Sequence, residues 1–257
     1  MKKFLNNGFF ILFLPFACML SACKHSLDAD LVYGEVKIVY STDALNDLYI
    51  VDIDGQNNLP LLKLRERGID VAWFPHASRI VYAERLGHSD RDTTYVWLFD
   101  LKTKLKSLLF VENEHVPSQF SVSPRGDKIA YRRYDIVKNV AQVCVITSDG
   151  LGKRLILTNT ATLNQFPKWS PDGSKIVFVS GINENADICM INADGSGFRK
   201  LTDKPGNDSE PSFSPDGKKL VYRSTANEKH AIVIMDIAGT DPHTITAMDS
   251  VYRGHPV

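Results

Sequence analysis

The sequence predicts an all-β protein, namely a five-bladed β-propeller of four-stranded antiparallel blades that is closed by its N- and C-terminal segments. Three observations carry this prediction: an internal repeat, four short strand patterns in each copy, and no helical pattern of about 10–15 residues between the strands. The repeat is clearest in four prolines, Pro75, Pro124, Pro171 and Pro215, whose spacings are 49, 47 and 44 residues. Periods of this length are typical of propeller blades.

Each copy has the same succession of strands and turns. An apolar strand follows the proline, a second apolar or alternating run comes next, and a turn such as Asp149-Gly150 or Asp194-Gly195 leads into a last short strand. The first of these strands has an aromatic residue at one fixed position. Recurrence once per copy favours a place in the core between blades rather than a ligand-binding surface. The members of this aromatic column are Tyr40, Tyr82, Tyr131, Phe178 and Tyr222.

Two further columns follow the repeat. Cys144 and Cys189 occupy the same place in consecutive copies. Equivalent strands of adjacent blades should lie about 10 Å apart, whereas a disulfide needs Cα atoms within ~7 Å, so we expect buried thiols. A basic residue also begins the apolar strand in every copy, where it either covers the sheet edge with its long side chain or contributes to an anion-binding ring. These basic residues are Lys37, Arg79, Lys128, Lys175 and Lys219.

The two ends of the chain divide one repeat between them. Residues 211–215 form the first strand of the fifth copy, and residues 254–257 and 31–33 continue the same register for the first copy. We therefore expect residues 254–257 to lie beside the strand that contains Lys37 and Tyr40. A sixth blade would need roughly 45 more residues.

The N-terminus has the pattern of a secretory signal. Lys2 and Lys3 precede an apolar run over residues 9–20, which Pro15 interrupts and which is shorter than the ~20 residues of a membrane-spanning helix. The run ends in Leu20-Ser21-Ala22-Cys23, which resembles the lipobox of bacterial lipoproteins; an ordinary signal peptidase site is the alternative. The sequence then divides into a signal peptide (1–22), the lipidated Cys23 with a short tether (23–30), and a propeller (31–257).

The lipobox resemblance also implies a location. It implies an exported protein that is held in the bacterial envelope by the lipid on Cys23 and has no other contact with the membrane. Lys24 stands where an aspartate retains lipoproteins of enteric bacteria in the inner membrane. By that resemblance we expect the outer membrane, with the protein facing the periplasm.

The repeat itself resembles the TolB-like propeller repeat. The residues that carry the resemblance are Trp169-Ser170-Pro171-Asp172-Gly173, the matching run that ends in Ser214-Pro215-Asp216-Gly217, and the later Asp-Gly turns. The resemblance covers nearly all of residues 31–257. TolB-like blades occur in transport-complex scaffolds, peptidase gates and polysaccharide-processing proteins, so the repeat implies the fold more strongly than a function. The separate N-terminal α/β domain of TolB has no counterpart here, so we expect a TolB-like protein other than TolB.

Composition and motifs argue against several functions. Lys and Arg number 30, as do Asp and Glu, and no basic run with interleaved aromatic residues suggests nucleic-acid binding. Gly-x-Ser-x-Gly is absent, and no Cys and His have the spacing of zinc ligands. We therefore expect no cofactor, no metal and no catalytic residue, although the question of enzymatic activity stays open.

One position of the inner strands collects polar residues that we expect at the mouth of the central channel. It precedes the first apolar residue of each copy, and two carboxylates and an imidazole there would suit a small polar ligand or a metal. A solvated channel mouth is the alternative interpretation. The residues at this position are Asp70, Gln119, Phe166, Glu210 and His255.

The loops of one propeller face vary most between copies, and binding residues concentrate in such loops. The first hypothesis is therefore a non-catalytic scaffold that binds a protein partner through this long-loop face. The alternative is a carbohydrate-binding or polysaccharide-processing propeller with its site at the channel mouth. The candidate partner-binding residues are Arg65, Arg67, His88, Arg91, Glu114, His115, Tyr134, Asn185 and Asp208.

Overall fold

The computed structural model describes most of the predicted propeller. The described residues are 37–41, 47–52, 56–64, 67–86, 93–152, 155–156, 163–182, 185–226 and 229–246. The predicted signal peptide, Cys23, the tether and the two closing segments (31–33 and 254–257) lie outside these residues. In the part that the structure describes, regular structure consists of 19 strands and one three-residue 3-10 helix, Pro75–Ala77.

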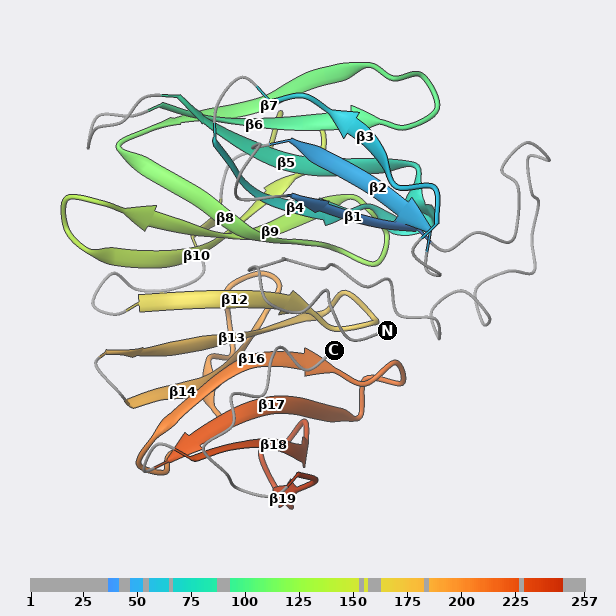
Figure 1. The fold of residues 1–257 in the computed structure, drawn as a ribbon. Helices are drawn as coiled ribbons and strands as arrows, with labels where there is room; N and C mark the ends of the chain where they lie inside the picture. The colour runs from blue at the N-terminus through green and yellow to red at the C-terminus, as the bar shows by residue number, and fades with distance from the viewer. Residues whose placement is uncertain are drawn as a thin grey trace.

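The first two groups of strands form separate antiparallel sheets, which we call unit 1 and unit 2. Figure 1 shows the unit 1 strands beside those of unit 2. Unit 1 comprises β1 (Lys37–Ser41), β2 (Leu48–Asp52) and β3 (Leu59–Leu62), and unit 2 comprises β4 (Arg67–Trp73), β5 (Arg79–Leu86), β6 (Thr93–Asp100) and β7 (Lys106–Asn113).

The remaining strands form three further four-stranded groups, units 3, 4 and 5. In Figure 1 they follow one another in chain order from β8 to β19. Unit 3 comprises β8 (His115–Val122), β9 (Lys128–Asp135), β10 (Val140–Thr147) and β11 (Leu155–Ile156); unit 4 comprises β12 (Leu163–Trp169), β13 (Lys175–Ile182), β14 (Asn185–Asn192) and β15 (Arg199–Lys200); unit 5 comprises β16 (Asn207–Phe213), β17 (Lys219–Ala226), β18 (Lys229–Asp236) and β19 (His243–Thr244).

Parallel contacts between successive units mark one end of the molecule. Ala141 of β10 pairs with Leu163 of β12, and Ala186 of β14 pairs with Asn207 of β16. Each pair joins the start of a third strand to the start of the next unit's first strand. The hairpins between second and third strands and the linkers between units therefore share one end, which we call the loop end. The opposite end, which holds the Pro-Asp-Gly turns, is the turn end.

The Ser-Pro-Asp-Gly sequence closes its turn with side-chain hydrogen bonds. Ser170 Oγ donates to Asp172 Oδ1 at 2.5 Å and accepts from the Lys175 amide at 2.9 Å. Gly173 has a φ of +71°, a conformation that strains other residues. The Ser170 hydroxyl and the amide and hydroxyl of Ser174 lower the pKa of Asp172 to about 2. Unit 5 repeats the arrangement at Ser214, which explains why this sequence marks the repeat so clearly.

The hydrophobic core lies between successive units, as the aromatic column predicts. Tyr82, Tyr131 and Phe178 are each at most 1% exposed, and four apolar clusters each combine residues of two neighbouring units. Cys144 belongs to the cluster between units 2 and 3, and Cys189 to the cluster between units 3 and 4. The prediction of buried thiols is confirmed, because the two cysteines lie in different layers of the core.

The basic side chains that begin the apolar strands contact polar side chains of their own sheets. Lys219 Nζ lies 2.9 Å from Asp236 Oδ1, Lys175 Nζ donates to Asn192 Oδ1 at 3.1 Å, and Lys37 pairs with an aspartate on β2. These cross-strand contacts join the second strand to the third strand at the turn end of units 4 and 5, and β1 to β2 in unit 1. The side chains are therefore already engaged within their own units, which weakens the interpretation as an anion-binding ring.

Candidate functional site

The predicted channel-mouth position lies on a β-bulge of the inner strands. The pairing of first and second strands shifts between Ser118 and Ser121 in unit 3, and units 4 and 5 shift at the equivalent place. In unit 2 the shift lies just before it, between Gly68 and Asp70. Gln119, Phe166 and Glu210 have φ values of +55°, +55° and +56°. A bulge of this kind breaks the alternation of side chains and re-aims one of them.

At this bulge, the side chain reaches from its own unit to the next one. Asp70 of unit 2 accepts the Phe120 amide of unit 3 on Oδ2 at 2.9 Å, and its Oδ1 accepts the Val71 amide at 2.9 Å. Gln119 of unit 3 in turn accepts the Phe166 amide of unit 4 on Oε1 at 2.7 Å. Phe166 of unit 4 also reaches toward the next unit, but its side chain is apolar and packs in the cluster between units 4 and 5.

Glu210 lies beside an arginine of its own unit. Arg223 Nη2 is 3.4 Å from Glu210 Oε1, and Arg223 Nε donates to Ser209 Oγ at 3.0 Å. Glu210 is 7% exposed. The structure thus joins Asp70 and Gln119 through adjacent residues of unit 3, places Glu210 with Arg223, and leaves His255 outside the described residues. A ligand role for these four residues stays a prediction.

Lys168 of unit 4 is a charged neighbour of Asp70 that was not among the residues predicted from the sequence. Burial raises the pKa of Asp70 to about 6, although the amides of Phe120 and Val71 and the charge of Lys168 oppose the rise. Burial likewise lowers the pKa of Lys168, and the charge of Asp70 opposes this change. The signal in the sequence is that Lys168 stands where units 2, 3 and 5 have small residues, namely Ala72, Ser121 and Ser212.

At the loop end, unit 3 presents an ordered corner of polar side chains. His115 Nε2 is 3.5 Å from Asp135 Oδ2, and Tyr134 donates its hydroxyl hydrogen to Asn139 Oδ1 at 2.7 Å. The guanidinium carbon of Arg132 lies 4.4 Å from the centre of the Tyr134 ring, and burial lowers the pKa of Arg132. Glu114, just before β8, is exposed. His115, Tyr134 and Glu114 thus all lie at the loop end of unit 3, and their role in binding a partner stays a prediction.

Units 4 and 5 contribute a second polar group to the loop end. Lys200 Nζ lies 2.9 Å from Oδ2 of the buried Asp187. Burial raises the pKa of Asp208, which the hydroxyls of Ser224 and Thr202 oppose and the charge of Asp187 reinforces. Asn185 is exposed at the start of β14. Arg67 begins β4 with only its backbone described, and the described residues do not include Arg65, His88 or Arg91.

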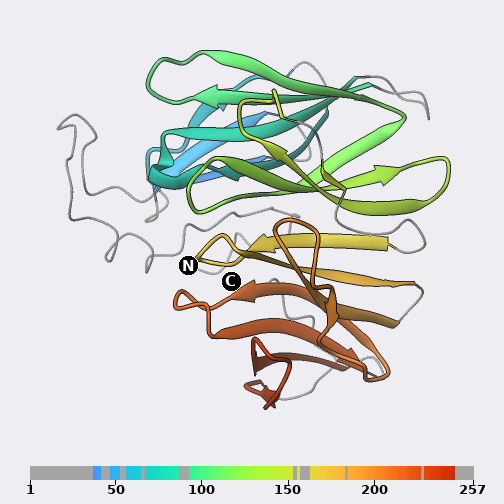
Figure 2. The same cartoon turned by 180° about the vertical axis from the view of Figure 1, so that it is seen from behind.

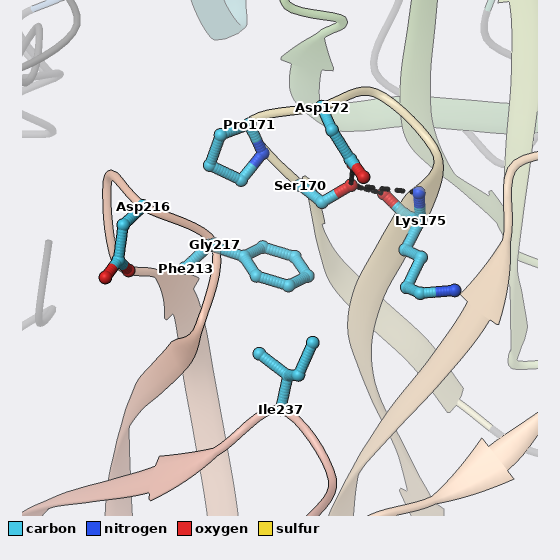
Figure 3. A pocket seen from close by; sticks show the side chains of 8 residues that line it. All are labelled: Ser170, Pro171, Asp172, Lys175, Phe213, Asp216, Gly217 and Ile237. Carbon is cyan, nitrogen blue, oxygen red and sulfur yellow. Dashed lines mark hydrogen bonds between the residues drawn. The ribbon is translucent and has the colours of Figure 1, made fainter.

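A shallow pocket of about 330 Å³ lies at the turn end between units 4 and 5. Figure 3 shows Pro171, Ser170 and Asp172 on one side of it and the Phe213 ring with Ile237 on the other. One unit earlier, the Trp169 indole occupies the same place as Phe213 and donates to the Ser121 carbonyl at 3.0 Å. The ring of Phe213 is smaller than the indole of Trp169 and fills less of this space. The pocket is therefore explained by packing.

Two kinds of feature are absent from the described residues. No group of three His, Cys, Asp or Glu side chains in this part of the chain has the arrangement of a metal site. No helix in the described segments has the length and apolar character needed to cross a membrane.

Comparisons with known proteins identify the architecture. Residues 112–256 match the family described as the TolB beta propeller domain. The chain is 26% identical over 149 residues to the Tol-Pal system protein TolB of Bordetella pertussis, an alignment that covers 58% of this chain and 32% of that protein. The chain thus spans about a third of the length of this curated relative.

Solved structures agree on the fold. The crystal structure of TolB from Acinetobacter baumannii superposes with a TM-score of 0.66 at 20% identity, covering 83% of this chain and 53% of that one. An oligogalacturonate lyase in complex with manganese superposes with a TM-score of 0.63 at 18% identity, covering 82% of this chain and 62% of that one. At such identities the similarity establishes a propeller fold shared by proteins of different function.

The protonation of Asp70 should control stability between pH 4 and pH 6. Because its pKa is raised in the folded state, the folded protein loses stability as pH rises from about 4 through about 6. Asp70→Asn keeps an oxygen for the Phe120 amide, although it gives up the acceptor of the Val71 amide, and should remove this step of about 1–2 kcal/mol from the pH profile. Urea denaturation at several pH values measures it.

Gln119→Glu is the matched reciprocal variant for this experiment. It places a carboxylate at the equivalent site of unit 3, where Gln119 accepts the Phe166 amide. We expect this variant to acquire a loss of stability above about pH 5. Parallel pH profiles for Asp70→Asn and the parent protein would contradict the role assigned to Asp70.

Proposed function

The chain belongs to the TolB β-propeller domain family, and we propose that it is an envelope lipoprotein whose propeller binds a protein partner at the loop end. The main observation that supports this proposal is the contrast between the two ends of the sheets. The turn end repeats one chemistry, in which Ser170 and Ser214 make the same hydrogen bonds in successive units. The loop end differs from unit to unit and carries polar groups of both charges, which is typical of a protein-binding surface.

The loop-end residues that support this proposal are held in place before any partner binds. Tyr134 is fixed by Asn139 and Arg132, and His115 by Asp135. Preorganised side chains lose little conformational entropy on binding. The proposed contact residues remain Arg65, Arg67, His88, Arg91, Glu114, His115, Tyr134, Asn185 and Asp208.

Site-specific photo-crosslinking in cells tests the choice of surface. A crosslinking amino acid at Val137 or Asn185, both exposed at the loop end, should give a discrete product with another protein. Leu151 and Asp194 are exposed at the turn end and serve as matched apolar and polar controls, from which we expect no such product. Products from the turn-end positions alone would contradict the proposal.

A polysaccharide-related function is the second candidate. It is supported by the likeness of fold to an oligogalacturonate lyase and by the charged pair of Asp70 and Lys168 on the inner strands. A cation such as Lys168 suits a carboxylated sugar. Calorimetric titration with oligogalacturonate discriminates between the two proposals, because the scaffold proposal expects no heat of binding and the second expects binding that Lys168→Ala abolishes.

The anchor is the first part of the proposal that can be tested chemically. Because Leu20 to Cys23 resemble a lipobox, we expect Cys23 to be the mature N-terminus and to carry lipid. Mass spectrometry of the membrane fraction should find a lipid-modified peptide that begins at Cys23, and Cys23→Ser should release the protein from membranes. An unmodified N-terminus at any other residue would refute the anchor and, with it, the proposed outer-membrane location.

We also propose that the ring has five blades, with units 1 to 5 as the blades and residues 254–257 as the closing strand beside β1. The indole nitrogen of Trp73 supports this proposal. It is buried without a hydrogen-bond partner among the described residues. The equivalent Trp169 donates to a carbonyl on the inner strand of the preceding unit, namely Ser121. A closing strand in unit 1 would supply the same carbonyl to Trp73.

Deletion of residues 254–257 should therefore destabilise the protein by a few kcal/mol out of a typical 5–15, at ~1 kcal/mol for each lost ladder hydrogen bond plus the lost apolar burial. Trp73→Phe should destabilise the full chain but cost little more in the truncated chain, because the carbonyl is already gone. Trp169→Phe is the control and should cost the same in both. An unchanged melting temperature on truncation would place the closure elsewhere.

A further inference from the structure

The outermost strand of unit 2 differs from its counterparts. Strand β7 has eight residues, whereas β3 has four and β11, β15 and β19 have two each. It pairs with β6 along its whole length, from Lys106 to Asn113. On its other side it pairs with none of the strands in the described part of the chain. Figures 1 and 2 show β7 at the outside of the molecule from both directions.

The side chains of β7 leave an apolar stripe at this edge. Leu108 is 49% exposed and Val111 is 39% exposed. Leu108 pairs with Trp97, and Val111 with Tyr95, and the two aromatic rings stack with centres 6.3 Å apart. The four side chains therefore lie on one face of the sheet and continue to its open edge.

A β-bulge explains how this stripe coexists with a buried side chain. The register of β7 against β6 shifts at Leu109, which is 8% exposed and packs in the cluster between units 2 and 3. Bulges and charged residues are the usual means by which an edge strand avoids pairing. Here the bulge turns Leu109 inward, and no charged side chain lies between Lys106 and Glu112.

The charges flanking β7 are arranged by sign along its direction. Exposed lysines precede and begin the strand, at positions 102, 104 and 106. Glu112 is buried and bonded to Arg133 of unit 3 at 3.0 Å, whereas Glu114, just beyond the end, is exposed. A strand with a basic start and an acidic end complements a second copy of itself when the two copies run antiparallel.

We propose that β7 is a self-association surface, at which two copies of this chain pair their β7 strands antiparallel across a two-fold axis. The backbone groups of the open edge supply the ladder hydrogen bonds, as in other cases of strand addition. Leu108 and Val111 of the two copies become cross-strand neighbours, and Lys104 of each copy approaches Glu114 of the other. A two-fold interface of this kind is self-complementary and closes after two subunits.

Sedimentation velocity of the purified full chain in detergent, at concentrations up to about 1 mM, tests the proposal. We expect a concentration-dependent dimer. Val111→Lys should raise its dissociation constant by about tenfold or more, because lysine on an edge strand opposes pairing. Leu151→Lys is the matched control at the turn end, where the leucine is 89% exposed, and should change the constant by less than about twofold.

Reversing the charges at positions 104 and 114 tests whether the two β7 strands run antiparallel. Glu114→Lys and Lys104→Glu should each weaken self-association by about threefold or more, whereas a mixture of the two variants should form dimers between unlike copies. Both substitutions lie at exposed positions outside β7, so the fold tolerates them. A chain that stays monomeric at all concentrations, or a dimer that Val111→Lys leaves unchanged, would overturn the proposal.

Discussion

Units 2, 3 and 4 are each apolar on both faces, so each of these sheets can bury its surface only against the sheets before and after it. The four apolar clusters each combine residues from two successive units. Stability is then built from the interfaces between neighbours, as in other repeat proteins. A change within one unit therefore acts first on the adjacent interface, and the first and last units have a free face unless the ring closes.

The same constraint governs the polar groups of the inner strands. The bulge leaves backbone amides such as those of Phe120 and Phe166 directed toward the previous unit, and a buried amide without an acceptor costs about 1–3 kcal/mol. Asp70 and Gln119 supply the acceptors. A carboxylate performs this role at a cost, because burial raises its pKa to about 6. A neutral amide such as that of Gln119 can accept the same hydrogen bond. The carboxylate of Asp70 is therefore a feature of the inner strands that packing alone does not require.

The sequence predicts the repeating features of the fold and fails where one copy departs from the others. The proline spacing, the aromatic column and the Asp-Gly turns identify the units because the same contacts recur in each. The directions of the Asp70 and Gln119 side chains were beyond prediction, because they depend on β-bulges. At Gln119 the bulge also has a φ of +55°, which residues other than glycine rarely adopt. Lys168 was detectable because the equivalent positions of units 2, 3 and 5 have small residues, yet its charged neighbour Asp70 depends on how units 2 and 4 lie relative to each other. The length of β7 follows from pairing with β6, which periodicity does not reveal.

The loop end and the β7 edge meet at Glu114, and this position links the two proposed interactions. Glu114 follows the last residue of β7 and precedes His115, which Asp135 holds at the loop end. A partner that covers Glu114 would remove an attractive charge from the β7 pairing, so partner binding and self-association should oppose each other. Linkage requires the opposition to be reciprocal: dimerisation should weaken partner binding by the same factor. A partner that instead contacts only the corner of units 4 and 5, around Asn185 and Asp208, would leave the β7 edge free for a second copy.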